Sequence, residues 1–297
     1  MNRRSRALAG IGFLIIAVAC FAALDTTTKF VALSLPVLMA LWFRYALQAL
    51  ITTAVVMPLR GLRAWRTHHP RFQLLRGALL FSSSLFAFYS LKFMPVGEFT
   101  AIVMITPLVV TLLAATSLGE RVSVLRWLLV AGGFTGTLMI LRPGGEGFSA
   151  ALLLPLGLVA SNAAFQVLTS RLARTEDPVT MQLYTGWVGT ALASLTLPFV
   201  WTLPPDLATW LRLLFMGLMA TIGHFLLILA YARAPASMLA PYGYAQIGFA
   251  MIGGWLVFSH VPDAWSLAGM ALVAACGALG AWLTVRESRL PVQPPES

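Results

Sequence analysis

Long runs of apolar residues, separated by short polar links, are the dominant pattern of this chain. Ten such runs can be drawn. Each contains about 20 residues, which as an α-helix rising about 1.5 Å per residue spans the roughly 30 Å hydrocarbon core of a bilayer. The runs are continuous and do not alternate with polar residues as barrel strands do, so the pattern predicts transmembrane helices. They cover residues 9–30, 34–57, 73–93, 96–117, 122–141, 149–171, 178–200, 208–231, 235–258 and 264–285.

A helical hairpin between Gly77 and Glu120 is repeated in the second half of the chain. In both hairpins the link contains a cation followed by a proline, Pro95 in the first and Pro235 in the second. Ten spans then divide into five and five, and because five is odd the second half enters the membrane from the opposite side. The alternative is an arbitrary division, since any ten-helix chain can be cut in two. We predict an all-α integral membrane fold with a cytoplasmic N-terminus (1–8), two inverted five-helix repeats (9–146 and 147–285) and a disordered cytoplasmic tail (286–297).

Composition excludes a soluble protein. The chain is 59% hydrophobic and 10% charged, with a mean hydropathy of +0.84, whereas soluble domains carry about 25% charged residues. The formal charge of +10 therefore reports orientation and not nucleic-acid binding. With the N-terminus inside, fifteen Lys and Arg residues fall on the inner side and four on the outer side, and Arg44 lies within a span, which accounts for all 20. We predict a multi-pass protein of the bacterial inner (plasma) membrane with both termini cytoplasmic.

The N-terminus has the features of a signal peptide, because MNRRSR precedes an apolar core and the sequence AVAC, which ends at Cys20. The apolar run continues to Leu24, so we expect a retained helix and not a cleaved leader. Cys20 and Cys276 both fall inside apolar runs, and neither a disulfide framework nor a zinc-binding spacing is present in the sequence. We therefore expect no metal and no cofactor.

Several stretches of the chain have a familiar order: WFRYAL around Arg44, LKFMPVGEFTAI, MITPLVVTLLA and GERVSVLRWLLVAGGFTGTLMIL. With them the chain resembles the drug/metabolite transporter superfamily, in its ten-helix branch of paired EamA-type domains. The resemblance covers residues 8–285 and implies a transporter, similar in overall shape to bacterial exporters of amino acids, including aromatic ones. The second half departs from the family pattern, because His260 stands where a glutamate is expected and no mid-helix proline corresponds to Pro107.

Polar residues inside the spans indicate faces that contact protein or water, because lipid cannot satisfy them. Arg44, Gln48 and Thr52 recur every four residues and form one stripe on the second span. Arg44 is suited to bind a substrate carboxylate or, alternatively, the backbone carbonyls of a broken helix. The aromatic residues are suited to line a cavity, to pack in the core or to form an interfacial belt. The candidates for substrate binding are Met39, Phe43, Arg44, Gln48, Tyr89, Asn162, Gln166, Tyr184, Trp187, Tyr242, Tyr244 and Gln246.

Two ionisable residues within the spans are candidates for proton or ion coupling. Asp25 lies four residues before Lys29, so that it forms either a local ion pair or part of a site. His224 lies midway along the eighth span and is either a proton relay or a hydrogen-bonded structural residue. The first span has no mid-membrane glutamate, the residue that small multidrug relatives of the superfamily use for proton antiport. The candidate hinges are Pro107, Pro241 and Gly243.

The sequence contains no HExxH, G-x-S-x-G or Walker motif, so it predicts neither an enzyme nor an ATP-driven pump. It also lacks the ring of charges typical of a channel, which argues against a channel. We predict a secondary-active or facilitative transporter that exports small amphipathic metabolites, above all aromatic or hydrophobic amino acids, by alternating access. Its expected partners are this substrate and membrane lipid, without nucleic acid or ATP. The alternatives are a broad-specificity drug/metabolite exporter, or an intramembrane enzyme or scaffold on the same fold.

Overall fold

The computed structural model describes residues 3–106, 108–110, 113, 124–141, 153–173, 175–234, 239 and 242–287, and the regular elements in these ranges are all helices. The all-α prediction is therefore confirmed. Pro107 and Pro241, two of the predicted hinges, lie outside the described residues. The helices are α1 (Arg3–Ala32), α2 (Val37–Arg60), the 3₁₀ helix η1 (Gly61–Trp65), α3 (Pro70–Phe93), α4 (Val96–Val103), α6 (Val124–Leu141), α7 (Leu154–Leu172), α8 (Pro178–Ser194), α9 (Leu197–Val200), α10 (Leu207–Tyr231), α12 (Ala245–Phe258) and α13 (Ala264–Glu287).

Four helical stretches are long and apolar enough to cross a membrane by length and composition. Shorter apolar helices accompany them at Val96–Val110, Trp127–Ile140, Ala245–Phe258 and Ala264–Gly280. The number of ten spans stays a prediction, because several of the expected spans are described only in part. The four long stretches are Leu8–Ala32, Val37–Trp65, Pro70–Phe93 and Leu207–Tyr231.

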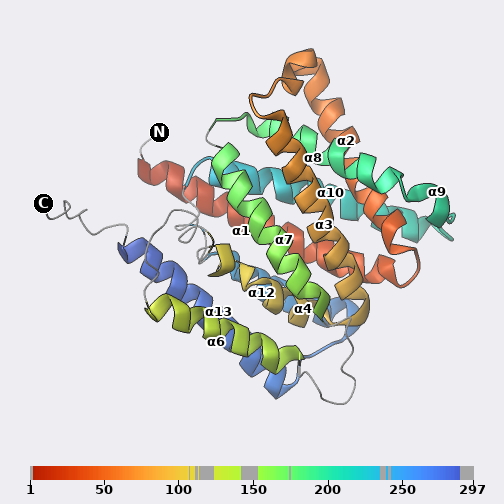
Figure 1. Cartoon of the computed structure of the whole chain (residues 1–297). Helices are drawn as coiled ribbons and strands as arrows, with labels where there is room; N and C mark the ends of the chain where they lie inside the picture. The colour runs from red at the N-terminus through yellow and green to blue at the C-terminus, as the bar shows by residue number, and fades with distance from the viewer. Residues whose placement is uncertain are drawn as a thin grey trace, which may run out of the picture.

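Helices from the two halves of the chain pack against one another in matching pairs. Helix α1 packs along α10, and α3 packs along α7 in the same way (Figure 1). Helix α2 contacts both α8 and α10, while α8 contacts both α2 and α3. Helices α6 and α13 lie side by side at one edge of the bundle, far from α2 and α8, and α4 and α12 lie between these two parts (Figure 1). Two inverted repeats facing each other would produce this pairing.

Aspartate caps begin two helices of the second half. The side chain of Asp177 accepts a hydrogen bond from the backbone N of Val179 at 2.7 Å, and Asp206 accepts one from Thr209 at 2.7 Å. Such caps satisfy amides that the first turn leaves free. The bonds from Thr209 lower the pKa of Asp206. Asp177 also forms an ion pair with Arg60 at 2.6 Å, which links the start of α8 to the end of α2.

The fourth span is interrupted directly after α4. Met104 and Ile105 form a turn, in which the backbone N of Ile105 donates to Ile102 O at 3.1 Å. Pro107 has no amide hydrogen for the carbonyl of Val103, the acceptor four residues before it. That carbonyl instead accepts from the hydroxyl of Thr106 at 2.6 Å. The described residues from 96 to 110 therefore do not form one regular helix, and the missing amide hydrogen of Pro107 supplies the reason.

The ninth span is also interrupted, at about the same distance in sequence from its first residue as the fourth span. Tyr244 lies in a turn directly before α12, and the backbone N of Ile247 donates to Tyr244 O at 3.1 Å, a bond of the 3₁₀ type. The sequence predicted that Pro241 and Gly243 loosen the helix here, and the described part of this stretch is indeed broken.

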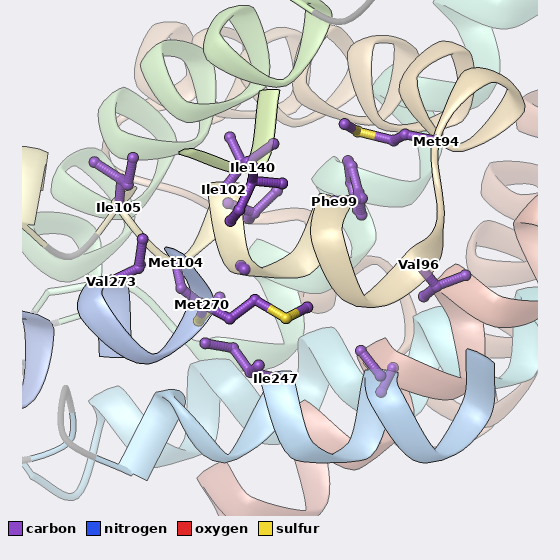
Figure 2. Packing of buried hydrophobic residues seen from close by; sticks show 14 of the residues in the cluster. Met94, Val96, Phe99, Ile102, Met104, Ile105, Ile140, Ile247, Met270 and Val273 are labelled. Atoms are coloured by element: carbon purple, nitrogen blue, oxygen red, sulfur yellow. The ribbon is translucent and has the colours of Figure 1, made fainter. Parts of the chain in front are cut away.

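The interrupted α4 is held in place by the largest cluster of buried apolar residues. Phe99 and Ile102 of α4 pack with Ile247 of α12 and with Met270 and Val273 of α13 (Figure 2). Burial of such side chains contributes roughly 1.5–3 kcal/mol each when the reference is water. The core therefore fixes α4 on α12 and α13.

The closest approach between α6 and α13 is made by two glycines. A Cβ atom added to Gly136 would lie 2.7 Å from the carbonyl oxygen of Gly269, and one added to Gly269 would lie 2.7 Å from that of Gly136. We expect Gly136→Leu to destabilise the protein by about 1–3 kcal/mol, because backbone cannot move aside as a flexible side chain does. Thermal unfolding in detergent measures this, with Gly248→Ala as control because a Cβ at Gly248 meets nothing within 4 Å. An unchanged unfolding temperature of Gly136→Leu would contradict the packing of α6 on α13.

Candidate functional site

Arg44 lies at the centre of a buried polar cluster between α2 and α3. Its side chain is 3% exposed, and its Nη1 donates to the hydroxyl of Ser84 on α3. The same hydroxyl lies 2.8 Å from the hydroxyl of Tyr45, and the Arg44 guanidinium carbon is 4.6 Å from the centre of the Tyr45 ring. No described residue bonds to Arg44 Nε. The cluster thus fixes the guanidinium in position while leaving one of its N–H groups for another partner.

The polar stripe of α2 continues from Arg44 through Gln48 and Thr52. Gln48 is 0% exposed, and within the described chain neither of its amide atoms has a hydrogen-bond partner. The hydroxyl of Thr52 is likewise unpartnered. An unpaired buried polar group costs about 1–3 kcal/mol, so that such groups mark places where water or a ligand binds. The stripe therefore presents hydrogen-bonding groups that no described residue uses.

Asp25 joins this cluster from α1. Its Oδ2 accepts a hydrogen bond from Gln246 Nε2 of α12 at 3.3 Å, and Arg44 is the cation whose charge acts on it. Three helices that are distant in sequence thus contribute a carboxylic acid, a guanidinium cation and an amide to one cluster. Asp25 as a whole residue is half-buried.

His224 approaches from α10. Its Nδ1 lies 2.9 Å from the carbonyl oxygen of Ala220, so this ring nitrogen carries the proton and donates. The ring packs edge-on against Phe21 at 4.8 Å between centroids. The charges of both Arg44 and Arg76 act on His224, which places it within electrostatic reach of two buried guanidinium groups.

The expected local ion pair between Asp25 and Lys29 is absent from the described structure. Lys29 Nζ instead donates to the carbonyl oxygens of Leu91 at 3.1 Å and Met94 at 2.8 Å. These carbonyls end α3 and have no amide partner within the helix, so that a cation there is favourable. Lys29 therefore ties the end of α1 to the end of α3.

The amides of α7 form a separate polar group. Gln166 Nε2 lies 3.5 Å from Asn162 Oδ1, and Gln166 Oε1 accepts from the hydroxyl of Tyr231 on α10 at 3.1 Å. Asn162 and Gln166 are both half-buried. The predicted amide pair thus exists, and it connects α7 to α10.

Two predicted aromatic candidates on α8 face the η1 segment and not the Arg44 cluster. The hydroxyl of Tyr184 donates to Trp65 O at 3.2 Å, and Trp187 Nε1 donates to Thr53 Oγ1 at 3.0 Å. A role of Tyr184 and Trp187 in binding stays a prediction, without a contact to the central cluster.

Met39 and Phe43 lie at the other end of α2, near the segment before α10. Met39 Sδ lies 3.4 Å from the backbone N of Thr202, and the Phe43 ring is 5.4 Å from that of Trp210 and 6.0 Å from that of Trp201. These contacts make the pair a wall at one end of the bundle.

The remaining tyrosine candidates have different surroundings. Tyr89 on α3 and Tyr242 are exposed, whereas Tyr244 is buried in the cluster of Figure 2. The Tyr244 hydroxyl is buried, and no bond to it is formed within the described ranges. Gly277 allows its approach, because a Cβ there would overlap the Tyr244 ring.

Arg76 is the residue that the sequence analysis missed. In the sequence, Arg76 counts among the fifteen cations of the inner side. In the structure, its side chain on α3 is 1% exposed and is one of the largest that are fully buried. A signal was available, because Gln73, Arg76 and Ser83 recur at helical spacing on the third span. Because Arg76 lies near the start of the predicted span 73–93, it was grouped with the cations of the preceding link.

Comparisons with known proteins agree on one family. The family model described as the EamA-like transporter family matches residues 8–142. A riboflavin transporter of Rhizobium johnstonii is 30% identical over 290 residues, which cover 97% of this chain and 95% of the relative. An S-adenosylmethionine uptake transporter of Rickettsia bellii is 26% identical and covers 89% of this chain and 90% of its own. The pseudopaline exporter CntI of Pseudomonas aeruginosa is 28% identical, covering 91% and 95%.

A solved crystal structure has the same fold. It superimposes with a TM-score of 0.67 at 21% sequence identity and covers 97% of this chain and all of that chain. The relatives named above are transporters, which agrees with the prediction that the protein is not an enzyme.

Proposed function

Because the chain belongs to the EamA-like transporter family of the drug/metabolite transporter superfamily, we propose that it moves a small amphipathic metabolite across the bacterial inner membrane by alternating access. The observation that supports this most is the Arg44 cluster between helices of both halves, in which Gln48 and Thr52 have side-chain atoms without a partner among the described residues. Polar groups of a substrate would supply the missing hydrogen bonds. Arg44 and Asp25 would face its charged or polar end.

The two halves are the elements that would move. The matching pairs α1–α10 and α3–α7, together with the interruptions of the fourth and ninth spans, support repeats at 9–146 and 147–285 that rock against each other. The start of α1 and the end of α13 lie on the same side of the bundle (Figure 1), which supports the assignment of both termini to the cytoplasm. Gly243, where added side-chain atoms would meet nothing within 4 Å, remains the hinge candidate that the structure describes.

The substrate is proposed as a class. Relatives are named for riboflavin, S-adenosylmethionine and pseudopaline, three different small organic molecules. Aromatic and hydrophobic amino acids, the prediction from sequence, are also small organic molecules. The relatives include both uptake transporters and an exporter, so their names do not give the direction of transport. Export, the direction predicted from the sequence, therefore belongs to the proposal.

Counterflow into liposomes tests the proposal. Vesicles containing purified protein are loaded with unlabelled solute and presented with labelled riboflavin, S-adenosylmethionine, phenylalanine or tryptophan. We expect uptake above that of empty vesicles for at least one solute, and a loss of this uptake in Gln48→Leu, which preserves volume but removes the unpartnered amide. Thr53→Val, in the same helix but at the η1 face, is the matched control. A silent panel from folded, inserted protein would overturn the proposed substrate class.

A further inference from the structure

A second buried guanidinium lies between α3, α7 and α8, outside the Arg44 cluster. Arg76 Nη2 donates to Met181 O and to Thr185 Oγ1, the latter at 2.5 Å, both on α8. The guanidinium carbon lies 5.4 Å from the ring centre of Phe165 on α7. In the described structure Nε and Nη1 of Arg76 make no hydrogen bond. The side chain is therefore fixed through Nη2, while two of its buried nitrogens have no partner among the described residues.

Unpartnered polar groups gather at the same level of the bundle. Gln73, one turn before Arg76 on the same face of α3, is 0% exposed, and neither of its amide atoms is bonded to a described residue. Helices α3 and α7 run antiparallel, and Phe165 lies beside Arg76. Moving one turn along both helices therefore brings Thr169 to the level of Gln73. The buried Thr169 hydroxyl is also without a partner in the described ranges.

Nothing in the described chain neutralises Arg76. No carboxylate lies within ion-pair distance of it among the described residues. A buried charge without a partner costs several kcal/mol, so that an isolated guanidinium requires an explanation. A helix packed in a similar way does without one, because α10 packs on α1 and α2 much as α3 packs on α7 and α8, and the side chains that α10 buries include the apolar Leu213 and Met216.

We propose that Gln73, Arg76 and Thr169 form an oxyanion-binding site that takes one carboxylate or phosphate group of a small molecule. The guanidinium supplies charge-assisted hydrogen bonds, and the amide and hydroxyl supply neutral ones. The site lies toward the end of the bundle where the α2–α3 and α7–α8 links meet, which the positive-inside pattern assigns to the cytoplasm. It deepens the proposed function and rests on it in one respect, namely that the anionic group belongs to a carried metabolite on its way to Arg44.

Binding of two probe anions to the purified protein tests the site independently of transport. Thermal unfolding in detergent is followed at constant ionic strength while sodium benzoate or sodium phosphate replaces sodium chloride. We expect a saturable rise of the unfolding temperature with at least one probe, because a ligand that binds only the folded state stabilises it. The rise should persist in Arg63→Gln, an exposed arginine near the same end, and disappear in Arg76→Gln.

A second variant keeps the test decisive if Arg76→Gln does not fold. If the cluster binds no ligand, Gln73→Leu removes a buried unpaired amide and should raise the unfolding temperature without changing the anion titration. If the site is as proposed, the half-saturating anion concentration should rise about tenfold, as expected for loss of one hydrogen bond to a charged group.

The outcomes separate the two proposals. A rise of the unfolding temperature with benzoate alone would identify an organic carboxylate as the ligand. A rise with phosphate alone would identify a phosphate group. No stabilisation of the wild type by either anion, or an unchanged titration in both Arg76→Gln and Gln73→Leu, would overturn the site. A silent counterflow panel leaves these readings untouched, so failure of the proposed transport is distinguishable from failure of the site.

Discussion

Replacing Arg44 with glutamine is expected to lower the initial rate of counterflow by at least about 100-fold, which corresponds to about 2.8 kcal/mol. The physical reason is that Arg44 is linked to three elements at once. It donates to Ser84 on α3, and its charge acts on Asp25 of α1 and on His224 of α10. Removing one partner from a buried set of charges typically costs about 3–5 kcal/mol, because the remaining charge stays desolvated.

The control is an arginine whose ion pair lies in water. Arg60 bonds to Asp177 at 2.6 Å, with side chains 49% and 44% exposed. Exposed pairs contribute roughly 0–1 kcal/mol, so Arg60→Gln should change the rate only by a few-fold. Rates are compared at equal amounts of inserted, monodisperse protein. A full rate in Arg44→Gln, or an equal loss in Arg60→Gln, would contradict the assignment.

Ser84→Ala separates a positioning role of Arg44 from a direct one. If Arg44 acts only by holding α3, removing the Ser84 hydroxyl should reproduce most of the loss. If the guanidinium charge itself binds substrate, Ser84→Ala should keep most of the rate, whereas Arg44→Gln should raise the substrate concentration for half-maximal uptake. Asp25→Asn in the Arg44→Gln background should regain part of the thermal stability, since the unpaired carboxylate is then removed.

The sequence predicts those features that depend on local spacing. Continuous apolar runs are enough to predict a helical membrane protein, since only helices and closed barrels satisfy their backbone groups in lipid, and barrel strands alternate apolar with polar residues. The four-residue spacing of Arg44, Gln48 and Thr52 is enough to place them on one face, and the structure indeed buries all three. The interruption after α4 was also accessible, because Pro107 necessarily removes a donor from the helix.

Features that depend on distant partners were not accessible from the sequence. Gln246 bonds to Asp25 across 221 residues, and Lys29 bonds to carbonyls 62 and 65 residues away. Spacing suggested instead that Asp25 and Lys29 pair, because neighbours on a helix are the only partners that a sequence reveals. Tyr184 was likewise placed on a helix without its orientation, which the η1 segment determines through the carbonyl of Trp65.

Asp25→Asn is expected to make the rate of counterflow independent of pH, whereas the wild-type rate should rise as the pH falls through the titration of Asp25. Asp25 is an acid on α1 that bonds to Gln246 and on which the charge of Arg44 acts. As a carboxylate it competes with an anionic or polar substrate group for the guanidinium. As a neutral acid it releases Arg44, so protonation and substrate binding are favourably linked.

The sign and size of the effect follow from this competition. Asparagine imitates the protonated acid, can still bond to Gln246 and carries no charge, so the variant should work at every pH at the high rate that the wild type reaches only in acid. A single titrating group changes a rate by at most about tenfold per pH unit, which sets the slope lost in the variant. Counterflow with equal pH on both sides measures this slope without a driving gradient.

His224→Gln separates the two ionisable candidates of the cluster. The histidine donates to the carbonyl of Ala220 within its own helix, and glutamine can make the same bond while remaining uncharged. If Asp25 is the titrating group, His224→Gln should keep the wild-type slope, as should Asp177→Asn at the exposed ion pair. A slope that survives in Asp25→Asn and disappears in His224→Gln would transfer the role to the histidine. A slope retained in both variants would remove proton linkage from the Arg44 cluster, and the solute gradient alone would then have to drive transport through this site.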